Sequence, residues 1–294
     1  AVFAGNAAIS ATTGSDLNTG SLVLVTTGTK TYRSSGGSVF VNQAFDNTNR
    51  NIAIHAAQNV AVNQPIVNFS NGSTLDINAG GDISVNAQID GRGGVAGGTA
   101  TLTAGGNVLL NQSIVSNNGT LSLNAGGTLT PSGGSGLFSG SGTINVTTGG
   151  NLSTGIYSTT GALNLRSTGG NVNVDTKINE ATGNTTIQAA GAVNVNQSIA
   201  NIRNGSNLNI TAGSNIVLNA QIDALDDAGT LATPVAGGAV TLTAGNNVTL
   251  NESIATFNGA VNVTASSGTL TFKPGTVFTG DGDAKRILAG SAPI

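Results

Sequence analysis

The sequence predicts an all-β protein, a single right-handed parallel β-helix (β-solenoid) over residues 1–294. Three observations predict this fold: a short unit recurs at near-constant spacing, apolar and polar residues alternate inside each unit, and 44 glycines punctuate the units. A repeat of about 20 residues cannot bury its own apolar side chains, so it must stack on its neighbours. We therefore expect roughly eleven stacked coils.

One unit is visible from Leu102 to Ile114, and it returns from Leu75 to Ile89. Each unit begins with a few alternating apolar and polar positions, which is typical of a strand. A Gly-Gly or Gly-Asn pair follows and predicts a turn with positive φ. A second short strand then ends in Asn, and a third apolar segment closes at Ile. The residues expected to point into the core include Val108, Leu110, Ile114, Leu121 and Leu123.

A long-range duplication lies over the short repeat. Ile54–Asp90 matches Ile187–Asp223, and the match extends over residues 51–142 and 184–282. The predicted organisation is a lead-in or cap at residues 1–20, coils over residues 21–283 starting near Leu22–Val25, and a tail at residues 284–294.

Composition excludes several classes of protein. The ten Lys and Arg residues and the pI near 4.9 exclude a phosphate-tracking surface, so we expect no nucleic-acid partner. The chain has no Cys, which excludes disulfides and thiolate metal sites. No apolar run approaches the length of about 18 residues that spans a membrane, so we expect no membrane insertion.

Asparagine recurs at the end of the second strand. Stacked coils would align these residues into a ladder whose amides bond to the coils before and after them, as in cross-β stacks. We interpret the ladder as structural, with ligand binding as the alternative. The ladder residues are Asn63, Asn86, Asn111, Asn196, Asn219 and Asn251.

The repeats Ala104–Val108, Ala125–Leu129 and Gly149–Leu152 resemble the coils of the filamentous haemagglutinin family, which are large exoproteins of Gram-negative bacteria secreted by the two-partner route. The resemblance is one of pattern and covers about residues 50–275. It implies a right-handed parallel β-helix that serves as an adhesive fibre shaft outside the cell. The secretion domain of that family carries Asn-Pro-Asn motifs, and this sequence has none, so the resemblance is to the shaft.

Parallel β-helices also include polysaccharide lyases and hydrolases, whose sites gather carboxylates on one outer face. The best concentration of acids here is Asp223, Asp226 and Asp227, on a loop that is longer in the second half. We interpret these acids as weak surface-loop candidates and expect no catalytic, cofactor-binding or metal-binding residues. The single His55 aligns with Gln188, which indicates a polar strand residue rather than a general base.

The sequence therefore favours a non-enzymatic structural segment of a secreted or cell-surface bacterial fibre or adhesin. We expect it to associate with further copies or coils of itself, because the end coils of a solenoid expose strand edges. A host or neighbouring-cell surface is the other expected partner. The alternatives are a carbohydrate-active β-helix enzyme and a filament subunit that polymerises end to end without an adhesive role. The pattern leaves open the ligand, the organism, the length of the parent protein, the export route, glycosylation and the oligomeric state.

Overall fold

The computed structural model describes residues 2–3, 5–21, 24–25, 28–46, 50–67, 72–92, 97–179, 183–200, 205–223, 238–256, 259–279 and 285–289. The chain divides into two compact units, Ala1–Thr148 (unit 1) and Gly149–Ile294 (unit 2). In each unit the coils contribute strands to three parallel sheets, so the predicted parallel β-solenoid is confirmed. Each copy of the duplicated segment, residues 51–142 and 184–282, falls inside one unit.

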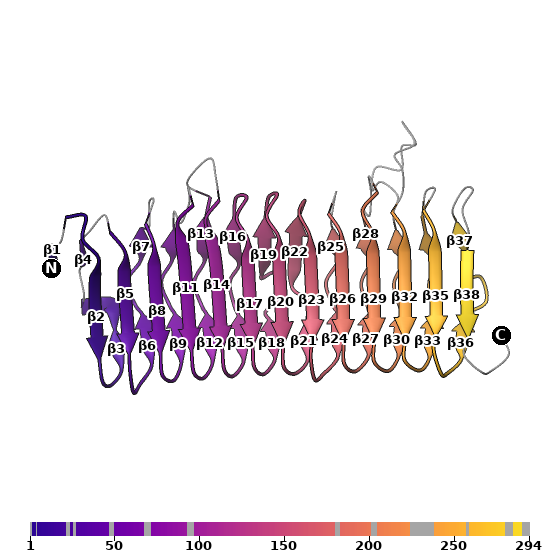
Figure 1. The fold of residues 1–294 in the computed structure, drawn as a ribbon, viewed down its shortest axis with the longest axis horizontal. Helices are drawn as coiled ribbons and strands as arrows, with labels where there is room; N and C mark the ends of the chain where they lie inside the picture. Colours follow the sequence, from indigo (N-terminus) through magenta and orange to yellow (C-terminus); the bar gives the residue numbers. More distant parts are fainter. Residues whose placement is uncertain are drawn as a thin grey trace. The chain divides into compact units, whose positions relative to one another are not determined.

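Successive coils of unit 1 lie side by side (Figure 1). Sheet 1 has the order β2(Ile9–Thr13), β5(Lys30–Ser34), β8(Ile52–Ala56), β11(Thr74–Ala79), β14(Thr99–Ala104), β17(Leu121–Ala125) and β20(Ile144–Thr148). Sheet 2 has the order β3(Leu17–Asn18), β6(Val39–Val41), β9(Val60–Val62), β12(Ile83–Val85), β15(Val108–Leu110) and β18(Leu129–Pro131). Sheet 3 has the order β7(Phe45–Asp46), β10(Ile66–Val67), β13(Ile89–Gly91), β16(Ile114–Ser116) and β19(Gly136–Ser139).

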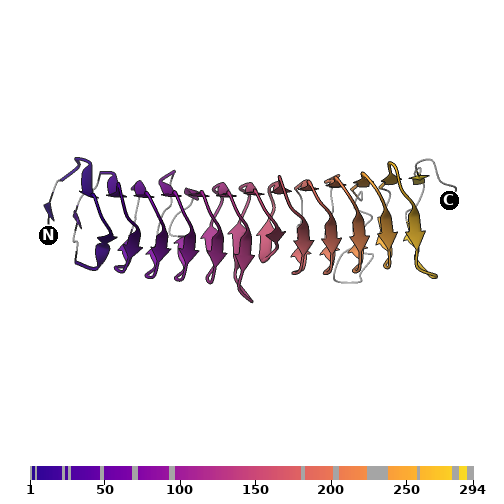
Figure 2. The same cartoon turned by 90° about the horizontal axis from the view of Figure 1, so that it is seen from below.

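Unit 2 repeats this arrangement (Figure 2). Its sheet 1 has the order β23(Leu163–Ser167), β26(Thr185–Ala189), β29(Leu208–Ala212), β32(Val240–Ala244), β35(Val261–Ala265) and β38(Lys285–Ala289). Its sheet 2 has the order β21(Leu152–Ser153), β24(Val172–Val174), β27(Val193–Val195), β30(Ile216–Leu218), β33(Val248–Leu250) and β36(Leu270–Phe272). Its sheet 3 has the order β22(Ile156–Thr159), β25(Ile178–Asn179), β28(Ile199–Ala200), β31(Ile222–Asp223), β34(Ile254–Ala255) and β37(Phe278–Thr279).

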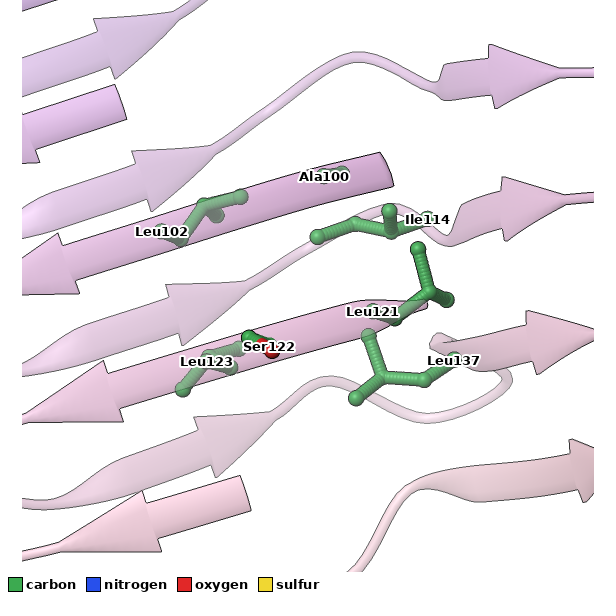
Figure 3. A pocket seen from close by; sticks show the side chains of 7 residues that line it. All are labelled: Ala100, Leu102, Ile114, Leu121, Ser122, Leu123 and Leu137. Carbon is green, nitrogen blue, oxygen red and sulfur yellow. The ribbon is translucent and has the colours of Figure 1, made fainter. Parts of the chain in front are cut away.

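The core lies between the three sheets and is built from the inward members of each alternating strand. The side chains predicted to point inward are all buried, with exposed fractions of 0 to 2% for Val108, Leu110, Ile114, Leu121 and Leu123. Figure 3 shows Leu121 and Leu123 of sheet 1 gathered with Ile114 and Leu137 of sheet 3. The void that these side chains leave is about 10 Å³, at the lower limit for a single water molecule. The core of unit 1 is therefore closely packed at this position.

Among the described residues, three aromatic rings are buried in the cores of the two units. Tyr32 stacks on Phe45 inside unit 1, with ring centroids 4.8 Å apart and planes 11° from parallel. Tyr157 is buried in unit 2, beside Ile178 in the register of sheet 3. Burial raises the pKa of Tyr32 to about 12 and raises that of Tyr157 further, so both phenols stay protonated at neutral pH.

Coil length varies more than the sequence repeat suggested. The side-chain bonds between coils show this directly: they join positions 21 apart at Asn42 and Asn63, 25 apart at Asn86 and Asn111, and 32 apart at Asn219 and Asn251. The strands nevertheless keep the same register from coil to coil, so that Leu75 pairs with Ala100 and Ala100 with Leu121. The turns therefore absorb the variation in length.

The predicted ends of the solenoid are wrong in detail. Ile9 pairs with Lys30 and Leu17 pairs with Val39, so part of the expected lead-in at residues 1–20 already forms coil strands. Leu24–Val25, expected in the first coil, instead forms β4, which pairs with β1(Val2–Phe3) in a separate two-stranded sheet. β38, expected in the tail at residues 284–294, pairs with β35. The sequence pattern did not indicate β2 because the central inward residue of this strand is Ala11, a small side chain that weakens the alternation. A short 3₁₀ helix, Thr19–Ser21, follows β3.

Candidate functional site

The predicted asparagine ladder of unit 1 lies directly after the strands of sheet 2. Asn86 Nδ2 donates a hydrogen bond to Asn63 Oδ1 at 2.8 Å, and Asn111 Nδ2 donates to Asn86 Oδ1 at 2.7 Å. The row continues beyond the predicted residues, because Asn63 donates to Asn42 and Ser132 Oγ donates to Asn111 Oδ1 at 2.6 Å. Each amide therefore joins the coil before it to the coil after it.

Unit 2 carries the second ladder. Asn219 Nδ2 donates to Asn196 Oδ1 at 3.0 Å, and Asn251 Nδ2 donates to Asn219 Oδ1 at 2.8 Å. The row begins at a carboxylate, since Asn196 Nδ2 donates to Asp175 Oδ1 at 2.8 Å. Both ladders lie on the outside of the coil: each ladder residue follows an inward strand residue, so strand alternation turns its side chain outward.

A second row of polar side chains, which the sequence analysis did not assign, lies at the turn before sheet 2. Here a side-chain oxygen accepts from a backbone N–H of the next coil. Asn59 Oδ1 accepts from Asp82 N at 2.8 Å, Asp82 Oδ1 from Asn107 N at 2.6 Å, and Asn107 Oδ1 from Thr128 N at 2.9 Å. In unit 2, Asn171 N donates to Asn151 Oδ1 at 2.9 Å. The recurrence of Asn, Asp or Thr after Gly-Gly was the signal for this row.

The close stacking of these turns explains their glycines, for which we expected positive φ. None of Gly80, Gly81, Gly105 and Gly106 has positive φ. A Cβ on Gly106 would collide with Asp82 Oδ1, and a Cβ on Gly105 would collide with the backbone carbonyl oxygen of the preceding coil. Glycine is required here because stacked turns approach each other too closely for a side chain.

The acids suggested as loop candidates are only partly described. Asp223 ends β31 and is half-buried, and its partners in the register are Ala200 and Ala255. Neither register partner of Asp223 is therefore a carboxylate. Asp226 and Asp227 lie outside the described residues.

The counterpart of Asp223 in the first half is Asp90, which is engaged by Arg92. Arg92 Nη2 donates to Asp90 Oδ2 at 2.7 Å, and its Nε donates to Asp90 Oδ1 at 3.0 Å. These hydrogen bonds hold the pKa of Asp90 below its ordinary value, with burial acting in the opposite direction. The pairing with Arg92 therefore favours the ionised form of Asp90.

His55 lies on the outer face of sheet 1 in unit 1, as the alignment with Gln188 indicates. Its Nε2 lies 3.1 Å from Asp76 Oδ2 on the next strand. The hydroxyls of Ser34 and Ser35, at the end of β5, donate to backbone carbonyl oxygens at 2.6 and 3.1 Å. The described geometry thus gives a His–Asp pair without a serine hydroxyl bonded to it.

Metal-binding clusters and membrane-spanning helices are both absent from the described residues. Among these residues, no group of three or more His, Cys, Asp or Glu side chains is placed to hold a metal ion. Within the same part of the chain, every helix is too short or too polar to cross a membrane.

Comparisons with family models, with curated proteins and with solved structures each return no match for this chain.

Proposed function

We propose that this chain is a non-enzymatic structural segment of a secreted or cell-surface bacterial fibre, and that it mediates adhesion or self-association through its outer surface and side loops. The observation that carries the proposal is the hydrogen bonding between polar side chains of successive coils. In both units, asparagines that would otherwise be free surface groups bond one coil to the next along the ladders.

Such ladders suit a segment that must keep its form outside the cell. Each ladder amide both donates and accepts along the stack, which adds side-chain bonds to the backbone pairing of the parallel sheets. The core beneath is apolar and closed, with interior positions such as Val85, Val195 and Ile216 fully buried. The resemblance of the repeats to the filamentous haemagglutinin shaft supports the same role.

Adhesion is tested with beads that carry the purified chain at a defined density. We expect these beads to adhere to epithelial or bacterial cells, or to each other, in excess of beads that carry an unrelated acidic protein of similar mass. Soluble chain added in excess should compete. Bead binding that equals the control on all of these surfaces, together with no clumping of the beads, would contradict the proposal.

The enzyme alternative is tested on a panel of acidic and neutral polysaccharides, with assays for reducing sugar and for unsaturated product. We expect no turnover, because the described register gives Asp223 only alanine neighbours. Reproducible product that disappears on Asp223→Ala would replace the structural proposal with a carbohydrate-active enzyme.

A further inference from the structure

A shallow hollow of about 280 Å³ opens on the surface of unit 1, where β5 and β8 end beside β11. Its polar lining comes from Arg33, Ser34, Ser35, His55 and Asn78, and the two alanines that follow His55 complete it. The hollow is open to solvent on one side, and its volume is enough for one sugar ring.

The hollow lies at a local concentration of charge. In sheet 1 of unit 1, the charged or ionisable groups besides Tyr32 are Lys30, Arg33, His55 and Asp76, all on β5, β8 and β11. The register places Arg33 beside His55 and His55 beside Asn78 on adjacent strands. Lys30 points into the core, so the charged side chains on the outer face of these strands are Arg33 and Asp76.

Three side chains of the hollow already have hydrogen-bonding partners within the protein. Ser34 and Ser35 donate to backbone carbonyl oxygens, and His55 Nε2 is held by Asp76 at 3.1 Å. Because Nε2 faces the Asp76 carboxylate, Nδ1 is the ring nitrogen that can bond to a ligand. The Arg33 guanidinium is exposed and makes no hydrogen bond or ion pair with the described residues.

We infer that this hollow binds a carboxylate-bearing sugar. The planar fork of Arg33 holds the carboxylate through two parallel hydrogen bonds, which is the geometry that guanidinium groups provide. His55 and the Asn78 amide then bond to ring hydroxyls, since both supply hydrogen-bonding groups beside the guanidinium. A charged anchor with such partners beside it fits an acidic monosaccharide better than a bare anion or a neutral sugar.

Unit 2 contains a natural comparison. Arg166 occupies the fourth position of β23, as Arg33 does in β5, and its register neighbour is Gln188. Thr211 follows on the next strand. The second unit therefore repeats the exposed arginine without the His–Asp pair, and Arg166 serves as a matched control for Arg33.

The inference depends on the hollow and not on the proposed fibre role. A chain that binds an acidic sugar without adhering to cells would leave this inference intact, and adhesion without sugar binding would leave the fibre proposal intact. A negative result in the sugar-binding experiment therefore leaves the fibre proposal standing, and a negative result in the adhesion experiment leaves the sugar-binding inference standing.

The test uses the full chain and the NMR signal of the His55 ring, which needs no assignment because the chain has one histidine. D-glucuronate is titrated at constant pH, and we expect a saturable shift with a Kd on the order of 1 mM, about −4 kcal/mol. Glucose, acetate, inorganic phosphate and an acidic dipeptide are titrated in parallel, and we expect each to bind at least tenfold more weakly.

Variants then assign the contacts. Arg33→Gln should weaken glucuronate binding at least tenfold, whereas Arg166→Gln should leave the Kd unchanged. Circular dichroism checks that both variants remain folded. The inference is overturned by the absence of a saturable shift, by equal binding to Arg33→Gln, or by acetate, phosphate, glucose or the dipeptide binding as tightly as glucuronate.

Discussion

At the scale of single residues, neighbouring positions in one strand have opposite surroundings. Leu110 is fully buried, whereas Leu109, one residue before it in β15, keeps 36% of its surface exposed. Replacing Leu110 with Asp puts an unpaired charge into a dry core, and we expect a loss of about 3–5 kcal/mol in unfolding free energy.

Urea unfolding followed by circular dichroism measures this loss, and Leu109→Asp is the matched control. The control should cost less than about 1 kcal/mol, as surface substitutions usually do. Equal losses for the two variants would contradict the assigned orientation of β15.

Lys30 is a polar residue at an inward position. It is 7% exposed, and its register partners in sheet 1 are Ile9 and Ile52. Burial lowers the pKa of Lys30, Arg50 lowers it further, and Asp46 acts in the opposite direction. The folded state therefore holds this proton less tightly than the unfolded chain, so the residue destabilises the fold while its ammonium is charged.

We expect Lys30→Leu to stabilise the chain by about 1 kcal/mol at pH 7. Since the parent gains stability as pH rises towards the ordinary lysine pKa of 10.5, the gap between variant and parent should narrow. Urea unfolding of both proteins at pH 7 and pH 10 checks this, and a variant less stable than the parent at pH 7 would refute it.

At the scale of the coil, close stacking of the turns explains the glycines. A Cβ on Gly105 would meet the carbonyl of Gly80, which belongs to the backbone and cannot rotate away. We expect Gly105→Ala to cost about 1–3 kcal/mol, as overpacking does. Gly133 has open space around it and no positive φ, so Gly133→Ala should be neutral or stabilising by up to about 1 kcal/mol. Thermal unfolding distinguishes the two, and equal Tm shifts would contradict the stacking explanation.

The ladder gives a second test at this scale. Asn86 both donates to Asn63 and accepts from Asn111, so Asn86→Ala removes two bonds between coils. Because the ladder is open to water, we expect a loss of only about 1–2 kcal/mol. Asn124, on the outer face of β17, makes no side-chain hydrogen bond to the described residues, and Asn124→Ala should change stability by less than about 0.5 kcal/mol. Indistinguishable urea midpoints would show that the ladder adds nothing to stability.

The sequence predicts the features that depend on neighbouring positions within a strand. It does not predict the features that depend on contacts between coils. Alternation predicts the strands and the buried face of Leu121 and Leu123, because a dry core accepts only apolar side chains. The crowding at Gly105 and the pairing of His55 with Asp76 depend on which residues of successive coils lie side by side. The length of each coil decides which residues of successive coils are adjacent. This length varies with the turns, and the strand pattern does not predict it.

At the scale of the whole molecule, β2 is the outermost strand of sheet 1 among the described residues. Ile9 N donates to Thr29 O and Thr13 O accepts from Ser35 N, so these residues face β5. In a parallel pair the backbone groups of alternate residues point to opposite sides, which directs the N–H of Thr12 to the open edge. Ile9 and Leu17 are each 9% exposed, whereas the corresponding interior residues Ile52 and Val60 are 0 to 1% exposed.

An open strand edge favours association with another strand. We therefore expect the chain to self-associate through β2, with a mean mass that rises in light scattering over about a hundredfold range of concentration. Thr12→Pro removes the edge N–H without breaking a bond to β5, so this variant should associate at least tenfold more weakly. Thr12→Ala keeps the N–H and should behave like the parent. A parent that stays monomeric over the whole range, or a proline variant that associates equally well, would show that this edge is not a point of assembly.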